Sequence, residues 1–250
     1  MVSDKSVTTF HLKLAAMVTM LIDHMGLLFF DDMFWMRLIG RCAFLFYAFM
    51  MAETYRHVRS NPARLQRHVV KLFLLSVVSE PLYDKALHGS WVYVDAQSVM
   101  LTFLIAFCCM FVMDSVNNMF GKGIVVVFAM GLAYVLKCDY DMAGVFLVVM
   151  FFLYREKYAD AGSGQRVYAL FGILLLYWVV CAVSFAEFDM SRFNKEFVSF
   201  AVWIPIESIC MGVLSIYGGA EGYRGRAFDT FYSLFYPLHL GALALVSCVL

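Results

Sequence analysis

Charged residues are scarce in this 250-residue sequence: they make up 15% of it, against about 25% in an average soluble domain. Hydrophobic residues make up 63%, and the mean hydropathy is +0.77. A soluble domain of this length has too little interior to bury such an excess, because its surface is large relative to its volume. The composition therefore predicts a surface that faces lipid.

Three further absences narrow the class of protein. The formal net charge is zero, which argues against nucleic-acid binding, where a basic surface is expected. The seven cysteines form no Cys-x-x-Cys pair, so packing in the core explains them better than a metal or redox site. The apolar runs do not alternate as the strands of a membrane barrel do. What remains is an all-α fold, a polytopic transmembrane helix bundle.

The apolar runs predict about nine spans, within a range of about eight to ten. The fifth and sixth are short for a bilayer that needs about 20 residues per span, so they are either two tilted spans or include a re-entrant segment. The first run has no small-residue cleavage site after it and is expected to stay as a span. Residues 1–250 are expected to form a single domain. The predicted helices are Leu12–Phe30, Phe34–Glu53, His68–Leu87, Ser98–Asn117, Gly123–Lys137, Met142–Tyr154, Val167–Phe185, Phe197–Tyr217 and Thr230–Leu250.

The distribution of basic residues predicts the orientation. With the N-terminus in the cytoplasm, most of the 19 lysines and arginines fall in the inner segments, as the positive-inside rule requires. We therefore expect a multi-pass protein of the bacterial inner membrane. The basic run Arg56–Lys71 is expected to contact lipid phosphates, and it could also hold the nucleotide part of a cytosolic cofactor.

Ionisable residues lie inside or at the ends of the predicted spans, where a charge costs about 3 kcal/mol on insertion scales. On the predicted topology they share one depth, toward the outer face, and we expect them to meet in one pocket. These residues are Asp23, His24, Arg37, Arg41, Glu80, Asp84, Asp139, Asp141 and His239.

Two arginines in this group favour an anion between them. Arg37 and Arg41 are four residues apart, so they share one helix face and repel each other unless an anion intervenes. Asp23, Glu80 or the phosphate or carboxylate of a ligand could supply it, since guanidinium groups bind such anions bidentately. Asp23 and His24 point about 100° apart, so one can face the arginines and the other a substrate.

The two histidines favour proton transfer. A neutral His24 could take a proton from an attacking amine or hydroxyl. Tyr236 and Pro237 precede His239, and the proline is expected to kink the last helix and open space beside it. A structural role competes with each of these interpretations, because histidines and Arg–Asp pairs often only join neighbouring membrane helices.

Two other acidic residues lie in the predicted spans, and a structural role competes with a functional one for each. Glu53 lies one turn from Arg56 and His57, which favours a structural ion pair. Glu207 follows Pro205 and fits a structural or a functional role equally well.

At these residues the sequence resembles the TraX family of membrane proteins, which is named for the F-pilin acetylase. Two positions depart from the family pattern: Leu45 stands where proline is usual, and Ser98 stands where asparagine is usual. The resemblance extends over nearly the whole chain. The matching stretches are Leu12–Gly26, Arg37–Glu53, Ser79–Asp84, Asp139–Val145 and Phe231–Leu240.

The resemblance implies a fold similar to the acyltransferase-3 group and an acetyltransferase that uses acetyl-CoA as co-substrate. The expected acceptor is an exported peptide or glycan, either a pilin N-terminal amine or a cell-surface hydroxyl. No metal is expected, because the thioester is already activated. The candidate catalytic residues are His24, Asp23 and His239. The candidate substrate- and cofactor-binding residues are Arg37, Arg41, Glu80, Asp139, Ser98 and Tyr236.

Two non-enzymatic functions stay open beside this one. Intramembrane ionisable residues and proline-interrupted helices are also typical of transporters for small molecules or lipid-linked substrates. A non-catalytic membrane component of pilus or envelope assembly is the third possibility. The sequence leaves the acceptor and the oligomeric state open.

Overall fold

The computed structural model describes residues 7–30, 32–187, 201–223 and 225–247. This part of the chain forms nine α-helices, so the predicted all-α class is confirmed. Each predicted stretch contains one helix; residues 197–200 and 248–250 of the last two stretches lie outside the described residues. The helices are α1 (Thr9–Phe29), α2 (Phe34–Val58), α3 (Pro62–His88), α4 (Val99–Asp114), α5 (Met119–Val135), α6 (Asp141–Tyr158), α7 (Ser163–Phe185), α9 (Ile204–Ser215) and α10 (Arg226–Ser247).

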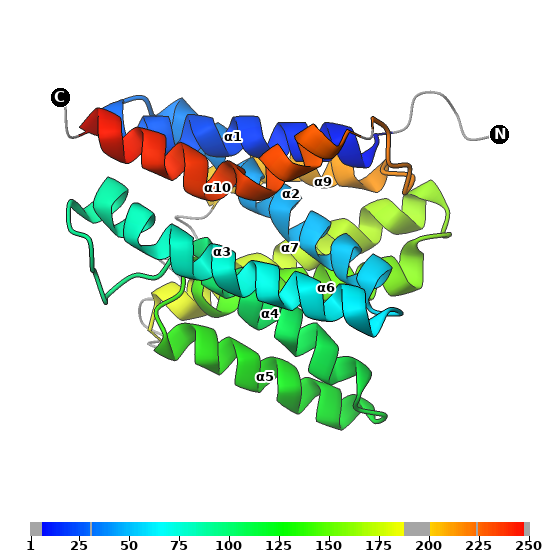
Figure 1. The fold of residues 1–250 in the computed structure, drawn as a ribbon. Coiled ribbons are helices and arrows are strands. Elements are labelled where there is room, and N and C mark those ends of the chain that lie inside the picture. The colour runs from blue at the N-terminus through cyan, green and yellow to red at the C-terminus, as the bar shows by residue number, and fades with distance from the viewer. Residues whose placement is uncertain (1–6, 31, 188–200, 224, 248–250) are drawn as a thin grey trace.

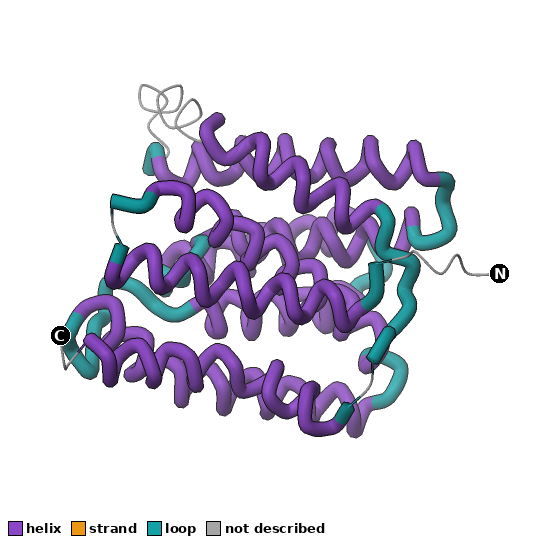
Figure 2. Tube along the Cα trace, turned by 90° about the horizontal axis from the view of Figure 1, so that it is seen from above, coloured by secondary structure: helices purple, strands orange, loops and turns teal. Residues whose placement is uncertain are grey.

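The helices form a bundle whose connecting loops gather at its two ends (Figures 1 and 2). Helix α2 is central and packs against α1, α3, α4, α6 and α9. Helices α1 and α10 lie side by side and run in the same direction along one edge of the bundle (Figure 1). The short fifth and sixth stretches are two separate helices, α5 and α6, that pack against each other.

Three helices in the described residues are long and apolar enough to cross a membrane: α1, α2 and α7. Shorter apolar helices are Val99–Asp114, Met119–Val135 and Ala201–Ser215, the last beginning with a 3-10 turn. Large apolar side chains also lie exposed along α3, such as Phe73 and Leu74, each 55% exposed. Such a surface is typical of a helix bundle in lipid. Membrane character therefore extends beyond these three helices.

Local sequence signals explain where α3 begins and ends, beyond the predicted bounds. Asn61 precedes the helix and accepts a hydrogen bond from the backbone N–H of Arg64 at 3.1 Å, while Pro62 occupies the first turn. Gly89 ends the helix with a φ of 71°, a conformation that glycine adopts without strain. These signals add a turn that hydropathy alone does not reveal.

We call one end of the bundle the basic end; there α1, α3, α5, α7 and α10 begin and the other described helices finish. Its ion pairs join helices far apart in sequence. Arg59 at the end of α2 lies 2.8 Å from Glu156 of α6 and 3.5 Å from Asp114 of α4. Lys13 of α1 lies 2.7 Å from Asp229 of α10. The predicted inner segments thus do gather at one end; that this end faces the cytoplasm stays a prediction.

Glu53 and Glu207 both have structural partners. The buried Glu53 carboxylate lies 2.8 Å from the buried Arg155 guanidinium of α6 and 3.3 Å from Arg56. Arg155 is a partner that sequence reasoning missed. The buried Glu207 carboxylate accepts a hydrogen bond of 2.5 Å from the indole N–H of Trp178, joining α9 to α7.

Candidate active site

A pair of buried histidines joins α1 to α10. His24 Nδ1 and His239 Nε2 lie 2.8 Å apart, and His239 Nδ1 lies 2.8 Å from the carbonyl oxygen of Phe235. A carbonyl can only accept, so His239 Nδ1 carries a proton and, in the neutral ring, Nε2 accepts. His24 Nδ1 must then donate, which leaves the lone pair of a neutral His24 on Nε2. The pair thus presents one basic nitrogen.

Asp23, one residue before His24, faces α2. Its carboxylate lies 2.7 Å from a guanidinium nitrogen of Arg37, so Asp23 supplies one of the anions that the sequence allowed beside the two arginines. Gly40 makes this approach possible, because a Cβ at that position would overlap the Asp23 carboxylate. Sequence reasoning missed Gly40, although it lies between the two arginines in the quoted stretch Arg37–Glu53.

The second arginine is held by aromatic rings. The Arg41 guanidinium lies 4.8 Å from the centre of the Trp203 ring and 6.0 Å from that of Tyr140. It is within electrostatic reach of both Asp23 and Asp139. Its buried Nε has no hydrogen-bond partner among the described residues. Buried polar atoms are normally paired, so this N–H is available to a ligand or to water.

Asp139 lies in a tight turn between α5 and α6. Lys137, Tyr140 and Asp141 have φ values of 54°, 61° and 50°, which cost side-chain-bearing residues about 1 kcal/mol or more each. Backbone hydrogen bonds of 2.9 and 2.8 Å to Gln97 hold the turn. Burial raises the pKa of Asp139 to about 6, against the opposing influence of the Arg41 guanidinium. The fold thus fixes a half-buried carboxyl beside the arginines.

Glu80 and Ser98 meet at the start of α4. The Glu80 carboxylate accepts the backbone N–H of Ser98 at 3.1 and 3.2 Å, so it helps to hold the first turn of that helix. The Ser98 hydroxyl is fully buried and has no hydrogen-bond partner within the described part of the chain. Whether either side chain also contacts a substrate stays a prediction.

Tyr236 lies between this group and the histidines. Its ring centre is 5.5 Å from that of His239 and 6.5 Å from that of His24. It is within electrostatic reach of Glu80 and Asp139. Its buried hydroxyl makes no hydrogen bond to any described residue. All nine predicted site residues therefore lie in one neighbourhood, which we call the polar cluster: Asp23, His24, Arg37, Arg41, Glu80, Ser98, Asp139, Tyr236 and His239.

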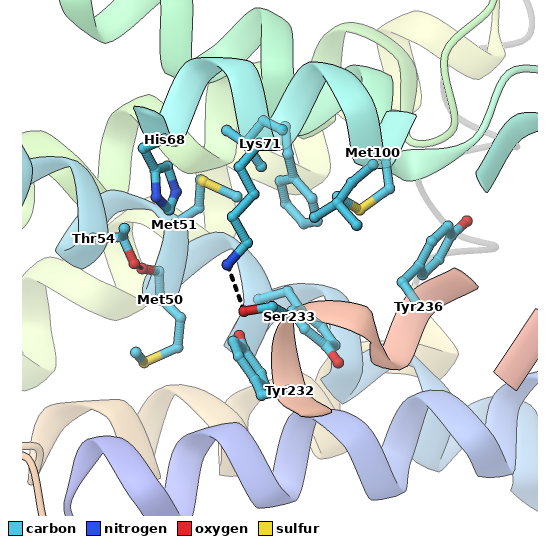
Figure 3. A pocket seen from close by; sticks show the side chains of 13 residues that line it. Met50, Met51, Thr54, His68, Lys71, Met100, Tyr232, Ser233 and Tyr236 are labelled. Carbon is cyan, nitrogen blue, oxygen red and sulfur yellow. Dashed lines mark hydrogen bonds between the residues drawn. The ribbon is translucent and has the colours of Figure 1, made fainter. Parts of the chain in front are cut away.

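A passage leads from the basic end toward this cluster. A cavity of about 590 Å³ opens among α1, α2, α3 and α10, with Lys13, Arg64 and Lys71 in its lining. It shares Lys71 and Ser233 with a narrower, mainly apolar cavity of about 90 Å³ that ends on Tyr236 (Figure 3). We call this narrower cavity the neck. Sequence reasoning expected a route from this end but identified neither the neck nor its methionine lining.

A separate cavity of about 610 Å³ lies at the opposite end of the bundle. Asp139 and Tyr140 from the α5–α6 turn line it, together with Tyr83 of α3. Tyr236, at the end of the neck, is within electrostatic reach of both Tyr83 and Asp139. The two cavities therefore approach the polar cluster from opposite ends. No three His, Cys, Asp or Glu side chains in the described residues gather closely enough to hold a metal ion.

The comparisons with known proteins agree with this arrangement of motifs. The chain is similar to a protein of Dichelobacter nodosus named "Probable fimbrial assembly protein FimC, serogroup H1", with 24% identity over 254 residues that cover 94% of each chain. No solved structure matches, so the likeness to the acyltransferase-3 group stays a prediction. The family model described as "TraX protein" matches residues 9–247, and the chain therefore belongs to the TraX family.

Proposed function

We propose that this protein is a multi-pass acetyltransferase of the bacterial inner membrane that moves an acetyl group from acetyl-CoA to an exported acceptor. The observation that carries the proposal is that two cavities approach one polar cluster from opposite ends, one lined by Tyr236 and the other by Asp139. One cavity would admit the donor from the cytoplasm and the other would admit the acceptor. The basic end then faces the cytoplasm, in agreement with the positive-inside rule.

The length of the passage fits an acyl-CoA. The residues from Lys13 to His24 on α1, and from Asp229 to His239 on α10, each rise about 15 Å at 1.5 Å per residue. Pantetheine has about twelve bonds between its phosphate oxygen and its sulfur, equivalent to about four extended residues or roughly 14 Å. With the phosphates near Lys13, the sulfur would reach the histidine pair.

We call the cavity of about 590 Å³ at the basic end the mouth. The side chains that line the mouth and the neck fit the same donor. The lining holds the cationic side chains of Lys13, Arg64 and Lys71, which could bind phosphate groups with charge-assisted hydrogen bonds. Three acidic side chains also line it: Glu53, which pairs with Arg155; Asp229, which pairs with Lys13; and Glu221. Met50, Met100 and Phe103 line the neck with apolar surface suited to a slender, weakly polar arm. A polar mouth followed by an apolar neck matches the two parts of an acyl-CoA, which are a charged nucleotide and a weakly polar thiol arm.

The histidine pair would carry the proton in the transfer step. The nitrogen or oxygen of the acceptor attacks the thioester carbonyl carbon while His24 Nε2 takes its proton. His239 accepts the Nδ1 proton of His24 in a hydrogen bond, which supports the charge that forms on the ring. When the carbon–sulfur bond breaks, the thiolate receives the proton from His24 and leaves as a thiol.

Two neighbours would stabilise the negative charge on the carbonyl oxygen. The buried Tyr236 hydroxyl, which has no hydrogen-bond partner among the described residues, could donate to that oxygen, and such donors contribute most where water is excluded. The Arg37 guanidinium adds positive charge and is itself held by Asp23. Arg41 and Asp139 border the acceptor side, where they would orient the incoming amine or hydroxyl.

The family name and the relative's name together favour an acceptor in pilus or fimbrial assembly. A pilin N-terminal amine is the first candidate, and the hydroxyl of a cell-surface glycan is the second. The same names also fit a membrane component of fimbrial assembly that performs no chemistry. Covalent transfer of the acetyl group distinguishes the enzyme from this alternative and from a transporter.

The proposal can be tested in inverted membrane vesicles, whose cytoplasmic face is outside. Acetyl-CoA with a radiolabelled acetyl group does not cross the bilayer, so label in the washed envelope material measures transfer. Wild-type vesicles should incorporate label, and His24→Ala vesicles with equal protein should incorporate roughly 100-fold less or lower still. Equal incorporation by the two would overturn the assignment. Mass spectrometry of the labelled material distinguishes an amide from an ester.

A further inference from the structure

Lys71 occupies the junction between the wide mouth and the neck. It lies on α3, lines both cavities, and reaches across to α10, where its ammonium donates a hydrogen bond of 2.5 Å to the Ser233 hydroxyl (Figure 3). The Ser233 hydroxyl in turn donates to the carbonyl oxygen of Asp229 at 2.7 Å. The Lys71–Ser233 bond therefore spans the route to Tyr236.

The surroundings of Lys71 favour exchange of this partner. The ammonium has three N–H groups, and it donates a hydrogen bond to a neutral hydroxyl, that of Ser233. Lys13 and Asp229 lie within electrostatic reach, but Asp229 is already paired with Lys13 at 2.7 Å. A phosphate entering the mouth would offer Lys71 a charged acceptor, and charge-assisted hydrogen bonds are roughly twice as strong as neutral ones.

We propose that Lys71 selects a phosphate-bearing donor: it closes the neck by bonding to Ser233 and opens it when a donor phosphate in the mouth takes its place. This inference rests on the proposed function, since it assigns a specificity-determining residue to the same passage. Helix α10 rises about 9 Å from Ser233 to His239. The Lys71–Ser233 hydrogen bond therefore lies closer to the basic end than the histidine pair does. A thioester without phosphate groups offers Lys71 no charged acceptor. The Lys71–Ser233 hydrogen bond then persists, and the neck stays closed.

Binding of two ligands to the purified full-length protein tests the inference. Coenzyme A carries phosphates, and pantetheine has the same thiol arm without them. Lys71→Met should weaken coenzyme A binding by roughly 10- to 100-fold, the worth of one charge-assisted hydrogen bond, while pantetheine binds as well as before or more tightly. Ser233→Ala should tighten the binding of both ligands, because the closing bond is gone. Lys85→Met, which removes a lysine from the far end of the same helix, is the matched control and should change neither.

The outcomes separate this inference from the proposed function. If the wild-type protein binds no coenzyme A, the proposed function and the role of Lys71 fall together. If the wild type binds coenzyme A but Lys71→Met weakens both ligands by the same factor, or weakens neither, only the role of Lys71 is overturned. A loss of coenzyme A binding in Lys85→Met equal to that in Lys71→Met would indicate a general effect of charge and would also overturn it.

Discussion

The hydrogen-bond directions around His239 decide which nitrogen of His24 is basic. The Phe235 carbonyl fixes the proton of His239 on Nδ1, so Nε2 of the neutral ring accepts. His24 Nδ1, which lies 2.8 Å from that Nε2, must then carry a proton and donate it. No property of His24 alone would place its lone pair on Nε2. The second histidine is therefore a positioning residue in this account, and the first is the base.

Substitution of His239 tests that division of roles. His239→Phe removes the acceptor for the Nδ1 proton of His24 and should lower the turnover number by roughly 10- to 100-fold, the worth of a hydrogen bond to a charged group. His239→Gln keeps an acceptor atom and should restore part of the rate. Both variants should bind coenzyme A as the wild type does. Equal rates in the Phe and Gln variants would indicate that His239 acts only by filling space.

Gly40 offers a second test at the scale of single residues. Gly40→Ala places a methyl group on the Asp23 carboxylate and should break the Asp23–Arg37 pair, with loss of most acetyl transfer. The matched variant is Gly26→Ala, whose Cβ would lie 2.7 Å from Met36 Cβ on the same helix pair but away from the carboxylate. Each should cost about 1–3 kcal/mol of stability, as overpacking does. The account fails if Gly26→Ala impairs transfer as much as Gly40→Ala at equal thermal stability.

Among the helices, α2 carries both the arginines of the polar cluster and one partner of a buried ion pair. Arg37 and Arg41 lie in the half of α2 away from the basic end, and Glu53, which pairs with Arg155 of α6, lies near the basic end. Both side chains of that pair are buried, at 5% and 7% exposure. Removing one partner of a buried ion pair leaves an uncompensated charge, which is costly.

Arg155→Met should therefore destabilise the protein by about 3–5 kcal/mol, because it leaves the Glu53 carboxylate buried with less compensation. The melting temperature in detergent measures the loss. The double variant Glu53→Gln with Arg155→Met removes both charges and should recover much of it. If the double variant is no more stable than Arg155→Met alone, the uncompensated charge of Glu53 is not the cause of the destabilisation.

The sequence predicted the helices better than it predicted their partners. Hydropathy located the nine α-helices of the described residues, and the spacing of four placed Arg37 and Arg41 on one face of α2, because helix periodicity fixes which residues share a face. Asp23 was one of several anions that the sequence allowed beside them. Arg155 was missed because it comes from α6, far along the chain from Glu53. The sequence placed the α5–α6 turn but not its conformation, because Lys137, Tyr140 and Asp141 take positive φ without glycine, so no local signal reveals it.

For the whole molecule, the parallel course of α1 and α10 sets the geometry. Contacts at two heights, Lys13 with Asp229 and His24 with His239, keep the two helices aligned to within about one residue, or roughly 1.5 Å. The basic end and the histidine pair are thereby held about 15 Å apart on both helices. This spacing is what lets the passage match the length of a thiol arm.

The predicted orientation can be checked in intact cells with a maleimide that does not cross the membrane. Val92→Cys lies in the exposed loop between α3 and α4, at the end opposite to the basic end, and should be labelled from outside. Asp160→Cys lies between α6 and α7 at the basic end and should be labelled only after the membrane is permeabilised. The reverse labelling pattern would place the cavity at the basic end on the external side of the membrane, where cytosolic acetyl-CoA cannot reach it.

The most direct test of the account is an experimental structure of the wild-type protein with coenzyme A bound. The account predicts phosphate density beside Lys13 and Arg64, an extended arm through the neck past Lys71, and a sulfur beside Tyr236 and His24. Coenzyme A bound in any other place, with the neck empty and Lys71 still bonded to Ser233, would contradict it.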